Sequence, residues 1–247
     1  MNESSDVKGY YEGFADEVLL EDFRRFNLRQ DAVRRLCHRY IPWGARVLEV
    51  GCGVGIISKY LQSLGCRVVG VDLSENNIRI ARAYAGSERC EFKAFDIIED
   101  AGDLPALGVF DAILLPDVIE HIPKDRYPGL FEGLEGRLSD SGIVLLTYPS
   151  PEYQKHLKSN HPDRLQVVDE TVELTDITNA SSLRLVYFAS QNVWEKNQYN
   201  HVVLTADREH DPQPIEMTFV ERLRYRVNKR LWRFRNRAFL ARQRRGR

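Results

Sequence analysis

The sequence contains no apolar run of about 18 residues, which is the length that a membrane-spanning helix needs. The first six residues, 1–6, are polar and acidic, and they lack the basic start and the apolar stretch of a secretion signal. From the sequence we therefore expect neither a transmembrane span nor a cleaved leader.

Cysteine is scarce and widely spaced: the four cysteines are Cys37, Cys52, Cys66 and Cys90. No two of them form a C-x-x-C pair, so the close-spaced ligands of a structural zinc site are absent from the sequence. Each cysteine lies in or beside an apolar segment. We expect four buried free thiols, as in a protein of the reducing cytoplasm.

The composition excludes fibrous and wholly disordered classes, because 43% of the 247 residues are hydrophobic and 29% are charged. The length suits one α/β domain with additions. The net charge of −1 conceals a strong asymmetry. Residues 221–247 contain twelve Lys or Arg and a single acid, so the remainder of the chain is acidic.

Short apolar runs alternate with segments of helical spacing along the middle of the chain. Strands are predicted at 46–50, 67–71, 90–95, 110–115 and 142–148, and helices at 10–40, 54–64, 74–85 and 124–138. This alternation predicts a parallel sheet with helices on both faces. Beyond it come a polar loop or broken helix at 149–168, a helix at 169–180 capped by Asp169, and two strands at 183–189 and 201–206 that form an antiparallel pair.

The most informative segment is 47–55, where an apolar strand runs into the alternating glycines Gly51, Gly53 and Gly55. Glycines let the backbone turn sharply near a ligand, and the helix that follows offers free N–H groups. The next strand ends at Asp72, whose carboxylate can accept hydrogen bonds from both ribose hydroxyls of a nucleotide. The G-x-G-x-x-G/A motif of dinucleotide dehydrogenases does not fit, because Ile56 stands at its third glycine.

The spacing E-x-G-x-G-x-G, with an acid ending the next strand, resembles motif I of the class I S-adenosylmethionine-dependent methyltransferases. The resemblance covers roughly residues 43–148. It includes the stretch 110–122, which is similar to the fourth strand of that family and its Glu-His-Ile turn. The resemblance implies a doubly wound, Rossmann-like α/β fold with a seven-stranded, mostly parallel sheet and a C-terminal antiparallel hairpin, here with N-terminal lid helices and a basic C-terminal helix.

Three parts of the chain follow from this reading. Residues 1–42 form an N-terminal helical lid. Residues 43–207 form the methyltransferase core, with a substrate loop at 149–168. Residues 208–247 form a linker and a basic amphipathic tail.

The resemblance implies S-adenosylmethionine as cofactor, bound by Tyr11, Glu49, Gly51, Cys52, Gly53, Gly55, Asp72, Leu73, Asp96, Ile97, Pro116 and Asp117. The glycine-loop backbone would pass under the methionine part, and Glu49 would hold its amino group or order the loop. Asp72 would bind the ribose. Leu73, with the pair 96–97, would lie against the adenine. The end of the fourth strand would line the path to the methyl group, and Tyr11 would belong to the lid.

Methyl transfer from a sulfonium depends mainly on how the acceptor is positioned, although a general base also accelerates transfer to a hydroxyl acceptor. His121, just after the fourth strand, is the first candidate for a base or an acceptor-positioning residue; the alternative is a turn-capping or packing role. His156 and His161, in the predicted substrate loop, are candidate acceptor contacts, and the alternative is that they are solvated. Asp117 and Glu120 alone are too few carboxylates to predict a metal site.

The segment 148–170 looks like the substrate loop of small-molecule methyltransferases from bacterial glycan and natural-product pathways. The Asp/Asn-Pro-Pro-aromatic run of base methyltransferases is missing after the fourth strand. The sequence therefore favours O-methylation of a sugar or related metabolite. The alternatives are an RNA-directed methyltransferase and a non-catalytic S-adenosylmethionine-binding protein.

The tail has one apolar stripe if it is helical, formed by Leu223, Val227, Leu231, Phe234 and Ala238. Basic residues occupy most of the remaining surface of 221–240, which is typical of a helix on an anionic membrane. Nucleic acid is less favoured, because binding phosphates requires no apolar stripe. The third alternative is docking on the acidic body or on a second subunit of a homodimer. The expected location is the cytoplasm, with peripheral attachment to the inner face of the membrane.

Overall fold

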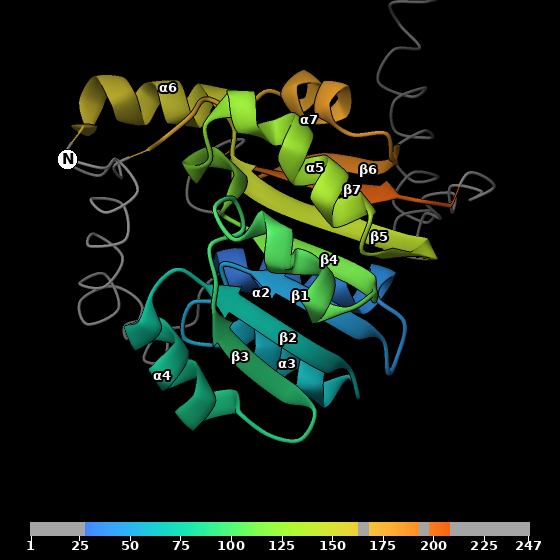
Figure 1. The fold of residues 1–247 in the computed structure, drawn as a ribbon. Coiled ribbons are helices and arrows are strands. Elements are labelled where there is room, and N and C mark those ends of the chain that lie inside the picture. The colour runs from blue at the N-terminus through green and yellow to red at the C-terminus, as the bar shows by residue number, and fades with distance from the viewer. Residues whose placement is uncertain (1–27, 163–167, 193–197, 208–247) are drawn as a thin grey trace, which may run out of the picture. The chain divides into compact units, whose positions relative to one another are not determined.

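The computed structural model describes residues 28–162, 168–192 and 198–207 (Figure 1). The chain divides into two compact units, Met1–His210 and Asp211–Arg247, and every described residue belongs to the first. Several predictions lie outside the described residues. They are the lid residue Tyr11, the helix over 10–27, residues 163–167 of the substrate loop, the linker and tail 208–247 and its stripe over 221–240.

Seven strands form one sheet in the order β3-β2-β1-β4-β5-β7-β6. They are β1 Arg46–Val50, β2 Arg67–Asp72, β3 Cys90–Ala94, β4 Phe110–Pro116, β5 Leu138–Pro149, β6 Arg184–Gln191 and β7 Tyr199–Thr205. Strands β1 to β5 pair in parallel. Strand β7 runs antiparallel to both β5 and β6. The mostly parallel seven-stranded sheet with a closing antiparallel pair is therefore confirmed.

Helices cover both faces of this sheet (Figure 1). They are α2 Leu28–Tyr40, α3 Ile56–Ser63, α4 Glu75–Ala85, α5 Tyr127–Glu135, α6 Pro151–Asn160 and α7 Leu174–Ala180. Apolar side chains of α2, α3 and α4 pack with one face of the sheet, and those of α5 and α7 pack with the other. The central strands are buried on both faces, which explains why they read as continuous apolar runs in the sequence.

Several local predictions are confirmed. The Ser74 side chain accepts a hydrogen bond from the Asn77 backbone N–H, so it caps α4 as expected. All four cysteines are buried free thiols. Burial raises the pKa of each thiol, and this keeps the sulfurs protonated and unreactive.

Two segments differ from the sequence predictions. The helix predicted over 124–138 is shorter, because a 3₁₀ turn Lys124–Arg126 precedes α5 and β5 already begins at Leu138. The segment predicted as a loop or broken helix at 149–168 contains the regular helix α6. Ser150 caps α6 and Pro151 occupies its first turn, where the missing N–H of proline costs nothing.

The prediction that Asp169 caps a helix is wrong. Helix α7 begins later, with Glu173 at the N-cap and Asp176 completing a capping box. The Asp169 carboxylate instead accepts a hydrogen bond from the Gln154 side chain of α6. That contact ties α6 to the segment that precedes α7.

Candidate active site

The glycine loop leaves the carboxyl end of β1 in a left-handed backbone conformation. Gly51, Gly53 and Gly55 have φ angles of 68°, 52° and 83°, which favour glycine strongly. A Cβ atom at Gly51 would lie 2.4 Å from Cγ2 of Val118, just after β4. The loop therefore lies directly against the segment that carries the predicted base, and it leaves no room there for a side chain.

Asp72, at the end of β2, fixes the glycine loop to the start of α4. Its Oδ2 accepts a hydrogen bond from the Gly53 backbone N–H at 2.8 Å. Its Oδ1 accepts from the Ser74 backbone N–H and from the Asn77 side chain, each at 3.0 Å. The residue predicted to bind ribose thus also has a structural task, which is to set the path of the loop.

Glu49, the acid of the motif, is only 2% exposed. The Ser58 hydroxyl of α3 donates a hydrogen bond to its carboxylate. Burial raises the pKa of Glu49 to about 8, and the negative charge of Asp72 acts in the same direction. The hydrogen bond to Ser58 ties the acid of the motif to α3, which fits the predicted role of ordering the loop.

The residues predicted near the adenine follow β2 and β3. Leu73 is half-buried, and Ile97 lies in the core at 8% exposure. Asp96 Oδ1 accepts hydrogen bonds from the Ile98 and Glu99 backbone N–H groups, at 2.9 Å and 3.1 Å. Asp96 therefore closes a turn at the edge of the site.

The end of β4 carries a strained residue. Pro116 ends the strand, and Asp117 has a φ of 56°, a left-handed conformation that is uncommon outside glycine. Its backbone N–H donates to the Thr147 carbonyl at 2.8 Å, and the Thr147 hydroxyl donates to Asp117 Oδ1 at 3.3 Å. The Arg29 guanidinium pairs with Asp117 Oδ2 at 3.0 Å.

Sequence reasoning missed Arg29 and Tyr199 as neighbours of the site. Arg29 lies in the first turn of α2, and it donates to the Tyr199 hydroxyl of β7 at 3.1 Å. Its guanidinium carbon is also 5.6 Å from the centre of the Tyr199 ring. No local sequence signal marks either residue, because the contact joins positions 170 residues apart.

His121 has a defined tautomer. Its Nδ1 lies 2.8 Å from the Val168 carbonyl oxygen, which can only accept, so Nδ1 carries the ring proton. Burial lowers the pKa of His121, and the ring is neutral at pH 7. The lone pair then belongs to Nε2, which lies 3.9 Å from Oε1 of Glu120.

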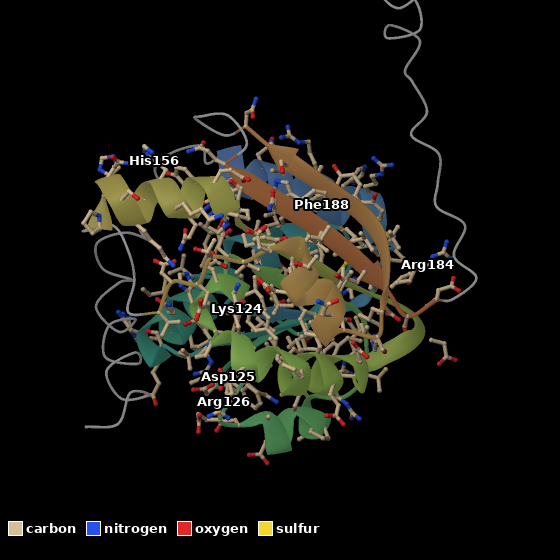
Figure 2. The ribbon with its side chains drawn as sticks, turned by 90° about the horizontal axis from the view of Figure 1, so that it is seen from above. Lys124, Asp125, Arg126, His156, Arg184 and Phe188 are labelled. Atoms are coloured by element: carbon tan, nitrogen blue, oxygen red, sulfur yellow. The ribbon has the colours of Figure 1, made fainter. Side chains whose placement is uncertain are left out.

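His156 and His161 form a group at the end of α6. Their ring centres are 5.8 Å apart, and the His156 ring also stacks on Tyr153 at 6.4 Å. His156 is exposed on α6, as Figure 2 shows. The structure gives both rings neighbours on their own helix, whereas His121 is held by a segment from elsewhere in the chain.

The residues present fit an S-adenosylmethionine site. The left-handed glycine loop, the carboxylate of Asp72 behind it and the strained end of β4 adjoin one another at the carboxyl edge of the parallel strands. That edge is where ligands bind in open α/β sheets. Among the described residues, no group of three His, Cys, Asp or Glu side chains is placed to hold a metal ion.

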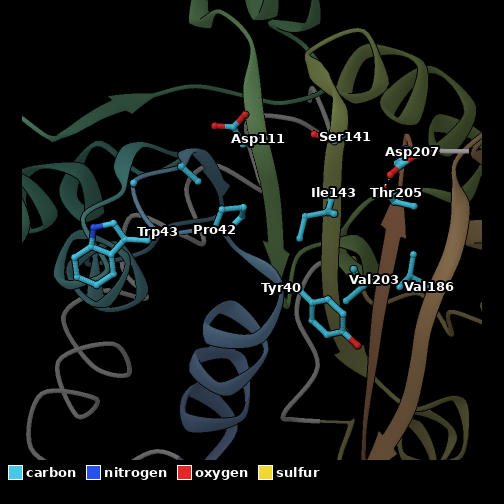
Figure 3. A pocket seen from close by; sticks show the side chains of 12 residues that line it. Tyr40, Pro42, Trp43, Asp111, Ser141, Ile143, Val186, Val203, Thr205 and Asp207 are labelled. Atoms are coloured by element: carbon cyan, nitrogen blue, oxygen red, sulfur yellow. Dashed lines mark hydrogen bonds between the residues drawn. The ribbon is translucent and has the colours of Figure 1, made fainter. Parts of the chain in front are cut away.

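A cavity of about 480 Å³ lies elsewhere, and it contains none of the predicted site residues. Residues at the amino ends of β1 and β4 line it, among them Ala45 and Asp111, together with Tyr40 and Trp43 (Figure 3). It therefore lies at the opposite edge of the sheet from the glycine loop.

None of the helices in the described part of the chain is both long enough and apolar enough to span a bilayer.

Comparison with known proteins agrees with the fold. The family model described as a methyltransferase domain matches residues 21–199. A ubiquinone biosynthesis O-methyltransferase of Bordetella parapertussis is 35% identical over 82 residues, which are 32% of this chain and 33% of that protein. The match thus spans about a third of that relative's length.

Two solved structures have the same fold. A magnesium protoporphyrin IX methyltransferase from Synechocystis PCC 6803, with bound SAH, gives a TM-score of 0.62 at 18% identity, over 83% of this chain and 99% of that one. An S-adenosylmethionine-dependent methyltransferase from Mesorhizobium loti gives a TM-score of 0.60 at 16% identity, over 72% of this chain and 97% of that one. At such identities these structures support the fold alone. With the family match over most of its length, the chain belongs to the methyltransferase domain family.

Proposed function

We propose that this protein transfers a methyl group from S-adenosylmethionine to a hydroxyl oxygen of a small-molecule or glycan acceptor, such as a sugar or a related metabolite. The observation that carries the proposal is the tautomer of His121. The Val168 carbonyl occupies Nδ1–H, which leaves Nε2 as the basic nitrogen next to the end of β4.

When bound, S-adenosylmethionine supplies a methyl group on a positively charged sulfur, which is already activated for transfer. The protein then has to hold the acceptor in line and remove one proton. His121 Nε2 would accept the proton of the acceptor hydroxyl as its oxygen bonds the methyl carbon, while the carbon–sulfur bond of the cofactor breaks and the sulfur leaves as a neutral thioether. The pKa of His121 is lowered by burial, so the ring is ready to act as a base at neutral pH.

The cofactor roles carried over from the family remain part of this proposal. The backbone of Gly51, Cys52 and Gly53 faces the methionine part, and Asp72 binds the ribose. Leu73 and Ile97 flank the adenine. The strain at Asp117 supports a functional role for the end of β4, because strained backbone persists where the surroundings hold it in place.

The test compares His121→Asn and His121→Ala with the wild type. Asparagine can still donate to the Val168 carbonyl but has no basic nitrogen. Loss of a general base lowers kcat by about 10²–10⁴-fold. The assay follows labelled methyl from S-adenosylmethionine into an extract of small molecules and glycans, and mass spectrometry and NMR locate the label. Calorimetry should give an S-adenosylmethionine Kd within about twofold of wild type for both variants.

His38→Asn, on the exposed face of α2, is the matched control and should leave kcat unchanged. Label on nitrogen or carbon would contradict O-methylation. Unchanged kcat in both His121 variants would remove His121 from the mechanism. Cofactor binding without any transfer would favour the non-catalytic alternative.

The basic tail supports a second proposal, which rests on sequence alone. Residues 221–240 combine an apolar stripe with dense positive charge, and this combination suits an anionic membrane surface at the cytoplasmic side. We expect full-length protein to sediment with anionic vesicles and a chain ending at Pro214 to stay in solution. Equal sedimentation of the full-length and the shortened protein would reject membrane binding by the tail. Binding of the tail to RNA but not to vesicles would favour the RNA-directed alternative.

A further inference from the structure

Glu120 is a buried carboxyl group beside the proposed base, and the proposed mechanism does not use it. It is 2% exposed and lies in the same 3₁₀ turn, Ile119–His121, as the base. Its Oε1 is 3.9 Å from His121 Nε2, the nitrogen that would take the proton. Its Oε2 has no hydrogen-bond partner among the described residues.

The turn that holds Glu120 is fixed at both ends. The Glu120 backbone carbonyl accepts a hydrogen bond from the Glu170 N–H at 2.7 Å, and the Tyr127 hydroxyl donates to the Ile119 carbonyl at 2.9 Å. The backbone that carries the buried carboxyl group is therefore held in place. A buried carboxylate with an unpartnered oxygen is costly, whereas a carboxylic acid avoids most of this cost by keeping its proton.

The surroundings favour the protonated form. Burial raises the pKa of Glu120 well above its ordinary value, and the charges of Asp117 and Asp169 act in the same direction, whereas a hydrogen bond from its own backbone N–H and the charge of Arg29 oppose them. The titratable and charged groups that interact with it are Arg29, Asp117, His121, Tyr127, Tyr148, Asp169 and Tyr199.

We propose that Glu120 is a second acceptor-binding residue, which works uncharged and donates a hydrogen bond from its carboxyl O–H to an acceptor oxygen beside the hydroxyl that reaches His121. The proposal rests on the proposed hydroxyl methylation. It deepens that function by selecting acceptors with two neighbouring oxygens, and it gives no ion pair to a cationic acceptor. Val168 already orients the His121 ring at Nδ1, and Glu120 lies at the other nitrogen, the reacting end of the ring.

The first measurement needs no acceptor. The infrared difference spectrum of wild type minus Glu120→Gln at pH 7 should contain the carbonyl stretch of a protonated carboxylic acid. Absence of that band means that Glu120 is ionised, and it overturns the proposal whatever the acceptor is.

The second measurement uses the methyl-transfer assay on the extract. Glu120→Gln keeps a neutral donor and should retain kcat/KM within about threefold, whereas Glu120→Leu should lose about 10²-fold or more, because a site built to bind a substrate oxygen is left without its donor. Glu152→Gln, exposed on α6, is the control and should change nothing. The S-adenosylmethionine Kd should be unchanged in all three, which also reports correct folding.

The outcomes separate the two proposals. If Glu120→Gln loses as much activity as Glu120→Leu, a charge is required and the uncharged role is wrong, while O-methylation stands. If Glu120→Leu binds the cofactor and keeps full activity, the acceptor contact is wrong. If the wild type places no methyl group on oxygen, the proposed function fails, and the acceptor contact fails with it even when the infrared band is present.

Discussion

At the residue scale, side-chain contacts in the site offset the cost of a strained backbone conformation. Asp117 is the non-glycine residue with positive φ among the residues that the structure describes, and such strain costs about 1–3 kcal/mol. Its carboxylate receives the Thr147 hydroxyl on one oxygen and the Arg29 guanidinium on the other. The path of the backbone after β4 is therefore maintained by side chains from α2 and β5.

The buried side chain of His201 should make the unfolding free energy depend on pH. It is 2% exposed, and neither ring nitrogen has a hydrogen-bond partner in the described part of the chain. Burial and then the charge of Arg35 lower the pKa of His201 to about 4. The unfolded chain takes up this proton near pH 6.5, so the native state loses stability as pH falls from about 6.5 toward 4. The loss attributable to His201 should reach about 2 kcal/mol at pH 5.

Urea denaturation at pH 7.5 and pH 5 measures that effect. In His201→Phe, which keeps a ring but cannot titrate, the difference in unfolding free energy between the two pH values should shrink by about 2 kcal/mol. His156→Phe, an exposed ring on α6, should keep the wild-type difference. Identical pH dependence in wild type and His201→Phe would mean that His201 is not the group responsible.

Gly51 gives a prediction about the loop. Gly51→Ala places a Cβ 2.4 Å from Val118 Cγ2, at a φ of 68° that alanine rarely adopts. We expect a loss of about 2–4 kcal/mol in unfolding free energy, from left-handed strain and from overpacking. Adding Val118→Ala to Gly51→Ala should restore only the part of the unfolding free energy that is lost to overpacking, because the backbone strain remains. Gly102→Ala has nothing within 4 Å of its Cβ and should cost less than about 0.5 kcal/mol.

At the element scale, the strands were predictable and the contacts between distant elements were not. Buried strands can be recognised in a sequence as short apolar runs, and the glycine loop and the Ser74 cap follow local sequence patterns. The prolines and polar residues of 149–168 predict a loop or broken helix there, whereas Pro151 lies in the first turn of α6, where a proline is favourable. The partners of His121 and Asp117 come from distant segments, Val168 and Arg29, and no local pattern encodes such contacts.

The cap of α6 can be tested directly. The Ser150 hydroxyl accepts the Tyr153 backbone N–H at 3.1 Å, and Ser150 is 1% exposed. Ser150→Ala should lower the unfolding free energy by about 1 kcal/mol. Ser63→Ala, whose exposed hydroxyl donates to a carbonyl within α3, is the control, with an expected change of less than about 0.5 kcal/mol. Urea denaturation of the two variants side by side decides whether the cap contributes.

At the scale of the whole molecule, cofactor binding and folding stability are linked. A ligand that binds only the native state at 100 times its Kd stabilises it by about 2.7 kcal/mol. If Asp72 binds the ribose, Asp72→Asn removes charge-assisted hydrogen bonds and should raise the Kd for S-adenosylmethionine by about 10–100-fold. At the same cofactor concentration, the added stability should then fall to about 1.4 kcal/mol or less.

The comparison is made within each variant, with and without cofactor, because Asp72 also anchors Gly53 and its loss changes the basal stability. Asp125→Asn is the control, since Asp125 is exposed on the surface beside Lys124 and Arg126 (Figure 2). Stabilisation by the cofactor that is equal in Asp72→Asn and wild type would show that the ribose contact lies elsewhere.

The reversal of chain direction between β5 and β7 has a further consequence. Because β7 is antiparallel to β5, Tyr199 at its start pairs with Pro149 at the end of β5, and Gln191 at the end of β6 pairs with Tyr199. The end of β6 and the start of β7 therefore both lie at the edge of the sheet that carries the glycine loop, whereas a parallel β7 would have begun at the opposite edge. The reversal thus brings Tyr199 to the same edge as Asp117, so that Arg29 can contact both side chains.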